Sequence, residues 1–494
     1  MSHRSITSLL YLSLTFTLPI TPLNAAETSA PDTTLSTLIV SANTSWLILS
    51  SLGVALASLG LILIRSGLMR LKNAIHPFFE QSIVIAAAIL GYWTLGWGVM
   101  FSDGTPWTGT SGLWFLLGTD NSPALLIERG GNANYAPANP HNPTPYDGVY
   151  DAAATIPAPL FLKFLFHALL AAFSAQIIFA PLSERLRYPA AGLFAFLYAT
   201  LIYPTVGHWV WGGGLLMLDP PEAGFTSFWG NFRDAAGASL LHLLPTVCAL
   251  PALIIVGARI GHYTDRSPYL IPQHNLPLFS LGIALTIIGL TAIGLGKATH
   301  ILAPEIIALA GLNSALSISA ATLSASLLSS FWIGKPSLRY TLLGALGGAI
   351  TISAPLTYVA PHAAFFVGLI SGLITILSIW FWQRLKIDDP TYTLSTHGSN
   401  SLLSLLLTGL FFQSDIARKT IAADTGLPPS LQLLQQFKGL LLILIFGLTA
   451  ATILWLILKS TLTLRVPVES EHQGLDQADL GEDPYPEFTR SSRH

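Results

Sequence analysis

The chain has 494 residues, of which 52% are hydrophobic and only 10% are charged, and its mean hydropathy is +0.60. Ordinary water-soluble domains do not have this composition, so we expect a polytopic membrane protein. The formal net charge of -2 says little about partners and gives no reason to expect nucleic acid. A single cysteine, Cys248, excludes a disulfide framework and a thiolate metal cluster.

The first residues have the pattern of a secretory signal. Arg4 precedes a short apolar stretch, "SLLYLSLTFTLPI", which runs into small residues near Ala25 and Ala26. We therefore predict a cleaved signal peptide over residues 1–26. The alternative is a first transmembrane helix, which the short length of the stretch and its proline disfavour.

Apolar windows of about 20 residues follow along the rest of the chain. Their Gly and Pro residues are compatible with transmembrane helices, in which neighbouring helices satisfy the freed backbone groups. We expect an all-α transmembrane domain over residues 27–461, followed by an acidic tail over 462–494. The predicted eleven spans lie near residues 43–64, 80–101, 159–181, 189–209, 236–258, 276–296, 303–332, 340–357, 362–383, 399–414 and 436–458.

The distribution of Lys and Arg predicts the orientation in the membrane. By the positive-inside rule, the basic connections lie in the cytoplasm, so the mature N-terminus is outside and the C-terminal tail is inside. Two long external connections, 102–158 and 212–233, are predicted to be irregular caps over a mouth. The exit of every odd-numbered span is basic, with Arg65, Arg70, Lys72, Arg185, Arg187, Arg259, Arg266, Lys335, Arg339, Arg384, Lys386, Lys459 and Arg465.

Two charged or ionisable residues stand in the apolar stretch "DAAGASLLHLLP" (234–245). Asp234 precedes a helix start, where a carboxylate accepts free backbone N–H groups, so one interpretation is an N-cap. His242 lies about 12 Å further along a helix, well inside the membrane. A histidine there is either a satisfied structural residue or part of a transport pathway, and ionisable residues inside membranes favour the pathway.

A second histidine, His397, opens the tenth span, as His242 lies in the fifth. Equivalent places in two five-span halves are typical of an inverted repeat with a site near the midplane. Two imidazoles can share one hydrogen bond without carrying a fixed charge. Such a pair suits a small neutral solute and disfavours a hydrated ion, which would lose solvation without replacement.

At these residues the chain resembles the ammonium transporter family Amt/Mep/Rh, and in particular its bacterial Amt branch. The similarity covers nearly the whole mature chain in order, and the set of motifs is specific, although each motif alone is weak. The motifs are "SGLMRLKN" (66–73), "LSERLRY" (182–188), "GHWVWGGG" (207–214), "DAAGASLLH" (234–242), "HNLP" (274–277), "GKPSL" (334–338), "RLKIDDP" (384–390), "HG" (397–398) and "LRVPVESEHQGLD" (464–476).

The resemblance implies a homotrimer in a bacterial inner membrane, with a pore through each subunit. It implies that His242 and His397 line a hydrophobic pore, and that Trp211, Asp234 and Phe166 belong to an external recruitment site for ammonium. An indole face can hold ammonium by cation–π attraction, worth roughly 0.5–2 kcal/mol. Tryptophan is also common at membrane boundaries, so anchoring is the alternative for Trp211. No cofactor, metal or enzymatic activity is expected, because no nucleophile–base set or phosphate loop occurs.

The chain departs from the family pattern at the external site. Counting from "SERLRY" places Leu170 where the family usually has a phenylalanine over the pore. Counting from "HNLP" places Ile293 at a second gate phenylalanine, Gly294 at an asparagine and Lys297 at a serine that helps to hold the cation. Tyr392 also stands where the family commonly has an acid.

Lys297 leaves three possibilities open. At about 7 Å and an effective dielectric near 20, two unit charges repel by roughly 2.4 kcal/mol, which lowers ammonium occupancy on the order of fifty-fold. The side chain can instead extend outward to water, or lose its proton in dry surroundings. The most useful observation is the position of the Lys297 ammonium group relative to the pore axis, because a lysine that blocks the mouth weakens the case for transport.

The tail has seven acids and no Lys or Arg between Val466 and Thr489, a composition typical of a solvated, disordered segment. The resemblance implies instead that it docks under the bundle, couples neighbouring subunits and meets a PII-type signalling protein. Two functions remain open: transport of ammonium or ammonia through the histidine-lined pore, and a weakly or non-conducting sensor of ammonium that acts through the tail.

Overall fold

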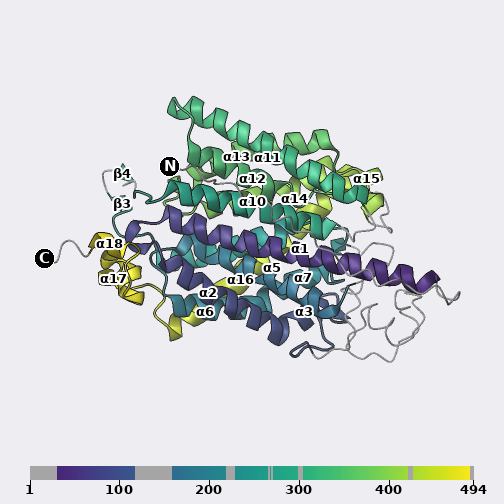
Figure 1. Cartoon of the computed structure of the whole chain (residues 1–494), viewed down its shortest axis with the longest axis horizontal. Coiled ribbons are helices and arrows are strands. Elements are labelled where there is room, and N and C mark those ends of the chain that lie inside the picture. Colours follow the sequence, from purple (N-terminus) through teal and green to yellow (C-terminus); the bar gives the residue numbers. More distant parts are fainter. Residues whose placement is uncertain are drawn as a thin grey trace, which may run out of the picture.

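The computed structural model describes residues 31–116, 158–217, 228–264, 267–268, 271–298, 304–420 and 427–489. Its helices run roughly along one common axis, as Figure 1 shows. The C-terminal helices α17 and α18 lie at one end of this bundle, which we call the tail end, and α15 lies at the other, which we call the loop end. The predicted signal peptide, residues 1–26, lies outside the described residues.

Most of the described chain is helical, as its Leu- and Ala-rich segments predict. The two hairpins, β1–β2 and β3–β4, each pair only two residues per strand. The elements before residue 260 are α1 Pro31–Leu68, η1 Leu71–Asn73, α2 His76–Gly91, η2 Tyr92–Gly96, α3 Trp97–Phe101, β1 Gly104–Thr105, β2 Thr108–Gly109, α5 Leu160–Phe179, η4 Ala180–Leu182, α6 Tyr188–Leu197, η5 Tyr198–Ile202, α7 Tyr203–Trp211, η6 Ala238–Leu243 and α9 Leu244–Val256.

The second half of the chain repeats the alternation of long helices and short connections. Its elements are β3 Tyr263–Thr264, β4 Ser267–Pro268, α10 Leu276–Ala298, α11 Pro304–Ile333, α12 Leu338–Thr351, α13 Pro361–Arg384, η7 Leu394–Ser399, α14 Asn400–Phe411, α15 Ser414–Thr420, α16 Pro429–Thr461, α17 Val468–Gln473, η8 Asp476–Leu480 and α18 Pro486–Thr489. The segments η2, η5, η6, η7 and η8 are π-helical, and η1 and η4 are 3-10 helices.

Each predicted apolar window contains a helix. Within the described residues, nine helices are long and apolar enough to cross a membrane. The helices in the windows 340–357 and 399–414 are shorter: α12 has 14 residues, and α14 has 12 residues after the six of η7.

The outer surface of the bundle is apolar, as a lipid-facing surface must be. On α11, Leu323, Leu327 and Phe331 recur every four residues and are 62%, 71% and 91% exposed. Polar side chains such as Asn313 and Ser317 of the same helix are buried instead. This distribution is opposite to that of a water-soluble helix and agrees with a multi-pass membrane protein.

Helices α1 and α10 pack in antiparallel contact because glycines remove side chains from their shared face. A Cβ atom added at Gly53 would lie 2.3 Å from Ala292 Cβ, and one at Gly60 would lie 2.6 Å from the Gly282 carbonyl oxygen. Close backbone approach at small residues is typical of membrane helices. The register of α10, and therefore the place of its last turn, is fixed by this contact. The glycines recur every seven residues, at 53, 60 and 67 on α1 and at 282, 289 and 296 on α10.

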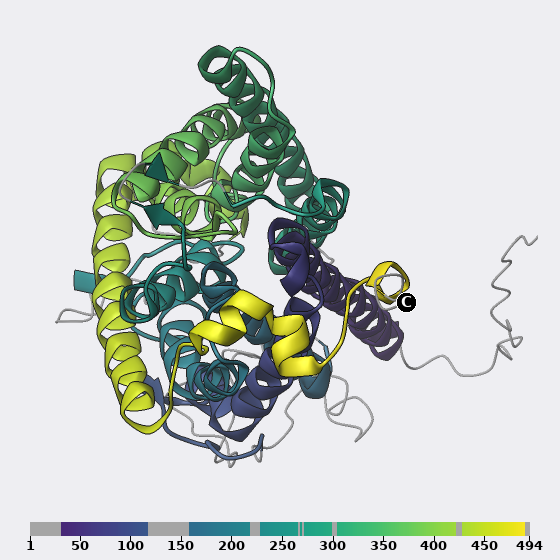
Figure 2. The same ribbon diagram turned by 90° about the vertical axis from the view of Figure 1, so that its left-hand side faces the viewer.

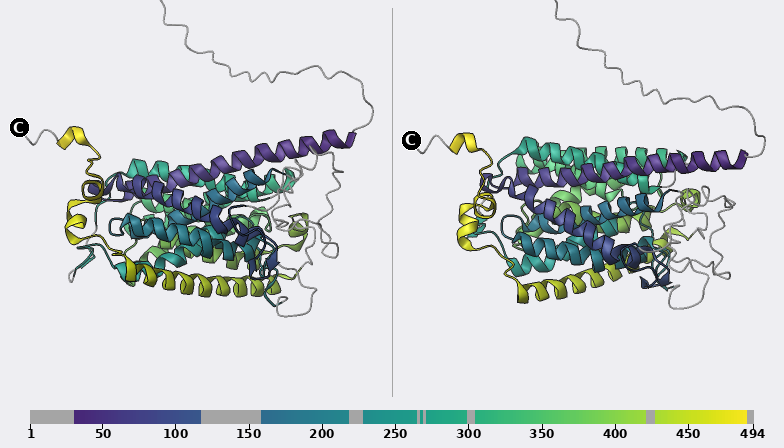
Figure 3. Two further views of the ribbon diagram at one scale, coloured as in Figure 1. Left: turned by 90° about the horizontal axis from the view of Figure 1, so that it is seen from below. Right: turned by 60° about the horizontal axis from the view of Figure 1, so that its bottom comes forward.

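The C-terminal tail folds against the tail end of the bundle. Figure 2 shows α17 and η8 crossing this end, and Figure 3 shows them there in two further views, with α16 along the flank. Lys72 Nζ donates to the Glu471 and His472 carbonyls at 2.6 Å each, and Arg465 of the tail donates to the Val256 carbonyl at the end of α9 at 2.7 Å. The order of this segment comes from specific partners in the bundle, which composition does not reveal.

One tail residue caps a helix of the bundle. The Asp476 carboxylate accepts hydrogen bonds from the Ile75 and His76 backbone N–H groups at 3.2 and 2.7 Å, at the start of α2. In the opposite direction, the Leu475 N–H donates to Asn73 Oδ1 at 2.7 Å. The tail therefore supplies a cap that the sequence around α2 does not contain.

We expect Asp476→Ala to release the tail. Loss of a carboxylate cap costs about 0.5–2 kcal/mol, so limited proteolysis of the tail should become roughly 2- to 30-fold faster. Asp483→Ala is the matched control, because among the described residues the Asp483 carboxylate accepts from the nearby Tyr485 N–H and not from the bundle. Equal cleavage rates for the two variants would contradict this assignment.

Candidate functional site

Two short segments at the centre of the bundle have the same local construction. Asp234 precedes His242 by eight residues, and Asp389 precedes His397 by eight residues. Each histidine lies in a π-helical segment, η6 or η7. A wider π turn within a helix is often found at functional sites.

Asp234 caps the first segment at the loop end. Its carboxylate accepts from the Gly237, Ala238 and Ser239 backbone N–H groups at 2.8–2.9 Å, and from Ser239 Oγ at 2.5 Å. Burial raises the pKa of Asp234, and these hydrogen bonds oppose that shift. Gly237 has a φ of 88°, which an L side chain rarely adopts. These contacts agree with the N-cap interpretation, because the Asp234 carboxylate accepts hydrogen bonds from backbone N–H groups at the start of η6.

Asp389 caps the second segment at the tail end. Its carboxylate accepts from the Leu394 and Thr391 backbone N–H groups at 2.7 and 3.1 Å. Burial raises the pKa of Asp389, and the hydrogen bonds oppose the shift, as at Asp234. The two segments therefore enter the bundle from opposite ends, each started by a buried carboxylate.

The two histidines meet where these segments converge. His242 Nδ1 and His397 Nδ1 are 3.0 Å apart, and both side chains are buried. One nitrogen must donate and the other accept, so the contact is compatible with two neutral rings. Gly398 leaves room for the Thr246 side chain beside this segment, since an added Cβ atom would lie 2.6 Å from Thr246 Cγ2. The Phe173 ring stands edge-on to His242 at 5.9 Å.

The loop end above this pair contains the residues of the predicted recruitment site. Trp211 Nε1 donates to the Asp234 carbonyl oxygen at 3.1 Å. Lys297 Nζ lies over the Trp211 ring, 3.8 Å from its centroid, which is within the range of a cation–π contact. Phe166 is buried beside His167, with ring centroids 5.4 Å apart. The structure thus brings Trp211, Asp234, Phe166 and Lys297 to one place, with the lysine ammonium on the indole face.

The divergent positions Leu170 and Ile293 are both buried in the apolar core, at 0% and 1% exposure. Gly294 packs closely against the turn after α12, where an added Cβ atom would lie 2.9 Å from Leu356 Cδ2. Leu170 and Ile293 are the two positions at which the resemblance predicts aromatic gate residues. The sequence interpretation did not single out His167, whose ring lies 6.0 Å from that of Trp211.

Helix α16 holds the segment that leads into Asp234. Gln436 accepts from the Arg233 N–H at 2.7 Å and donates to the Arg233 carbonyl at 2.7 Å. Gln432 donates to the Asn231 carbonyl at 2.8 Å. These two buried glutamines on α16 fix the loop in place, and no local sequence pattern links them to it.

A buried charge network lies at the tail end. Asp388 accepts from Arg259 at both carboxylate oxygens, at 2.9 Å each, and Arg185 approaches it at 3.6 Å. Glu184 pairs with Arg70 at 2.6 Å and with Arg259 at 3.4 Å. Burial would raise the pKa of Asp388, but the Arg185 and Arg259 guanidinium groups and the hydrogen bonds from Arg259 lower it well below its usual range.

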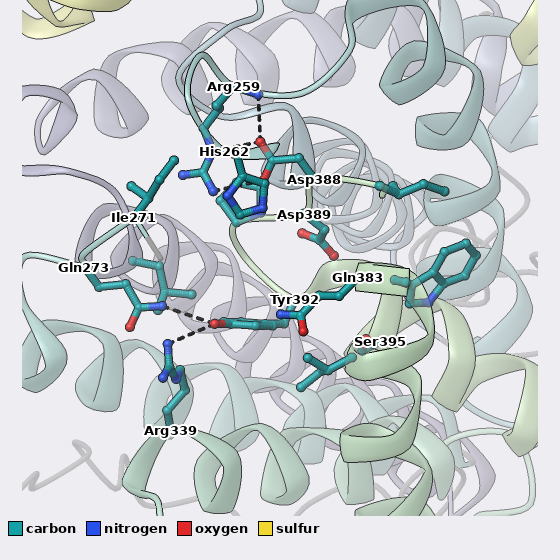
Figure 4. A pocket seen from close by; sticks show the side chains of 15 residues that line it. Arg259, His262, Ile271, Gln273, Arg339, Gln383, Asp388, Asp389, Tyr392 and Ser395 are labelled. Carbon is teal, nitrogen blue, oxygen red and sulfur yellow. Dashed lines mark hydrogen bonds and ion pairs between the residues drawn. The ribbon is translucent and has the colours of Figure 1, made fainter. Parts of the chain in front are cut away.

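A pocket of about 70 Å³ opens beside this network, and Figure 4 shows its lining. Asp388 and Asp389 lie side by side at one wall, with Ser395 of η7 at another. Tyr392, where the resemblance predicts an acid, accepts from Arg339 at 3.0 Å and Gln273 at 3.4 Å through its hydroxyl group. The pocket reaches the start of the His397 segment from the tail end.

The described residues thus form a polytopic helical membrane bundle in which two polar segments meet at a buried histidine pair. Among these residues, no group of three His, Cys, Asp or Glu side chains could hold a metal ion. The model of the Ammonium Transporter Family matches residues 45–485, and the chain belongs to this family. The resemblance predicted from the motifs is therefore confirmed.

Known relatives are similar over most of their length. The chain is 26% identical over 430 residues to the ammonium transporter Amt2 of Archaeoglobus fulgidus, covering 85% of this chain and 83% of Amt2. It is 28% identical over 453 residues to the ammonium transporter of Mycobacterium tuberculosis, covering 90% of each.

Solved structures share the fold. One is a sensor Amt protein, with a TM-score of 0.75 and 25% identity over 90% of this chain and 99% of that chain. Another is Mep2 of Saccharomyces cerevisiae, with a TM-score of 0.70 and 20% identity, covering 87% of this chain and 88% of that chain. The family is one of transporters and channels, and both a transporter and a sensor occur among the similar proteins.

Proposed function

We propose that the chain conducts ammonia across a membrane through a narrow passage at the His242–His397 pair. The observation that carries this proposal is the 3.0 Å contact between the two rings at the meeting point of two capped segments from opposite ends. A buried pair of neutral imidazoles offers hydrogen bonds to a small neutral solute. A hydrated ion would have to give up its water there, which costs far more.

The opposite entry of η6 and η7 supports an inverted repeat of two five-helix halves followed by α16. In this arrangement the helices include the shorter α12 and α14, which gives eleven spans. The basic residues at the tail end, such as Arg70, Arg185 and Arg259, favour a cytoplasmic tail and a periplasmic mature N-terminus. The proposed setting is a bacterial inner membrane, with residues 1–26 removed as a signal peptide.

The family resemblance also supports a homotrimer with one pore per subunit. The docked tail, held by Asp476 and Lys72 in its own chain, would face neighbouring subunits and a PII-type signalling protein in the cytoplasm. Trp211, Asp234 and Phe166 would form the external entrance. The Asp234 carboxylate oxygens already accept four hydrogen bonds. Asp234 would therefore contribute to the entrance through its negative charge and by holding the start of η6 as its N-cap.

Flux measurements test the proposal. The purified chain is reconstituted in liposomes with a trapped pH dye, and an ammonium salt is added outside. Ammonia that enters takes up protons, so the interior should become alkaline faster than in protein-free liposomes. A rate equal to that of protein-free liposomes would refute conduction.

A sensor with little or no conduction is the second candidate. Two observations favour it: Lys297 lies on the Trp211 face, and a similar solved structure is described as a sensor Amt protein. In this case ammonium would change the docking of the tail without flux. Protection of the tail from protease should then depend on ammonium while liposome alkalinisation stays at the protein-free rate.

A further inference from the structure

We infer that Lys297 is a tethered occupant of the external cation site, so that the entrance excludes free ammonium ion and admits neutral ammonia. The inference rests on the proposed function and specifies the species that enters. Lys297 Nζ is 3.8 Å from the Trp211 ring centroid. A free ammonium ion held by the same ring face would need the same position.

The lysine is directed to this position by the packing of its helix. Gly296 immediately before it faces α1, where an added Cβ atom would lie 2.3 Å from Ser50 Oγ. The glycines at 53, 60 and 67 on α1 and at 282, 289 and 296 on α10 form a close contact that we call the glycine seam. This seam fixes the last turn of α10 against the bundle. The negative charge of Asp234 also attracts the Lys297 ammonium group. The extended, water-facing position that a lysine could take at a membrane boundary is therefore not the one adopted.

A second observation concerns the neighbour of this cation. His167 is buried, its ring lies 6.0 Å from the Trp211 ring, and its Nδ1 has no hydrogen-bond partner among the described residues. A buried polar atom without a partner is costly unless a solute or water satisfies it. Ammonia, which both donates and accepts hydrogen bonds, fits beside a neutral imidazole. A second cation beside Lys297 does not.

The consequence for permeation is that the entrance would select neutral ammonia over the ammonium ion. Ammonium would release its proton to the outside water, and the neutral molecule would pass Trp211 and reach the histidine pair. Electrostatic repulsion by a lysine even 7 Å away lowers the occupancy of a second cation on the order of fifty-fold. With the lysine on the ring itself, direct exclusion adds to this effect.

The test compares the native chain with four variants in detergent and in liposomes. Methylammonium binding is measured by thermal shift and calorimetry, and charge movement by currents from liposomes on a solid-supported membrane. We expect no saturable binding and no current for the native chain. Lys297→Ser should bind methylammonium at least about fifty-fold more tightly and give an ammonium-dependent current, while Lys297→Arg should behave like the native chain.

Lys438→Ser is the matched control, because Lys438 Nζ also lies over an aromatic ring, 3.9 Å from the Phe228 centroid, but on α16. It should remain without binding or current. Trp211→Leu added to Lys297→Ser should abolish the gained binding. Methylammonium binding by the native chain equal to that of Lys297→Ser, or no binding by a folded Lys297→Ser, overturns the inference. Binding does not require conduction, so this result is separate from alkalinisation, which alone tests the proposed function.

Discussion

Replacing His242 with leucine is expected to reduce ammonia flux by roughly 5- to 150-fold. The rings of His242 and His397 are 3.0 Å apart between Nδ1 atoms in a buried environment. A solute that passes there without a hydrogen-bonding partner loses about 1–3 kcal/mol, and each 1.4 kcal/mol corresponds to tenfold in rate. Alkalinisation of liposomes under an ammonium gradient measures the change.

His397→Leu should have an effect of the same size, because either substitution leaves the other ring without its partner. The double variant should then lose little more than each single variant, as expected of two residues that act as a unit. His274→Leu is the control, since His274 contacts the Met69 carbonyl at the tail end. Normal flux in His242→Leu protein of native stability would show that the passage lies elsewhere.

Replacing Asp388 with asparagine is expected to destabilise the protein by about 3–5 kcal/mol, because the buried Arg185 and Arg259 guanidinium groups lose the counter-charge that Asp388 supplies. Arg259 binds both oxygens of Asp388 at 2.9 Å, and Asp388 is 3% exposed. Arg259→Lys should lose less, because it keeps the charge but not the two-point contact. Thermal unfolding in detergent measures both variants.

The stability that Asp388 contributes should depend on pH in a specific direction. The pKa of Asp388 is lowered in the folded protein, so the stability that it contributes is present above its ordinary pKa near 4 and decreases as the pH falls through that range. The difference between native and Asp388→Asn protein should be constant above about pH 5 and narrow below about pH 4. Glu482→Gln, in the exposed part of the tail, should match the native protein throughout. A difference that grows on acidification would contradict the assignment.

Sequence patterns predicted the helices well because a bilayer imposes strong local rules. A membrane helix must form the hydrogen bonds of its backbone internally and present apolar side chains to lipid. Its length and composition can therefore be recognised without knowledge of its neighbours. The family followed from motifs such as "DAAGASLLH" around His242, and the family match confirms it. The polar positions 234, 242 and 397 stand out for the same reason, since ionisable residues are rare in such segments.

Other features depended on contacts between distant parts of the chain. The charge of the tail predicts a solvated segment. In the structure, Asp476 of the tail caps α2, which lies some 400 residues earlier in the chain. Arg259 joins Glu184 and Asp388, which lie 75 and 129 positions away. His167 lies beside Trp211 only because α5 and α7 are neighbours in space. No periodicity or local spacing encodes such pairings.

The sequence by itself determined that this protein is a membrane-spanning helical bundle, because burial in lipid restricts composition residue by residue, and its motifs indicated the ammonium transporter family by resemblance. It left three possibilities open for Lys297: a charge near the mouth that repels ammonium, a side chain extended to water, or a lysine that has lost its proton. Only the tertiary structure decided where the side chain lies, which is on the indole face and not extended to water. The glycine seam between α1 and α10 sets where the last turn of α10 ends, and Trp211 stands within 3.8 Å of the ammonium group at that point.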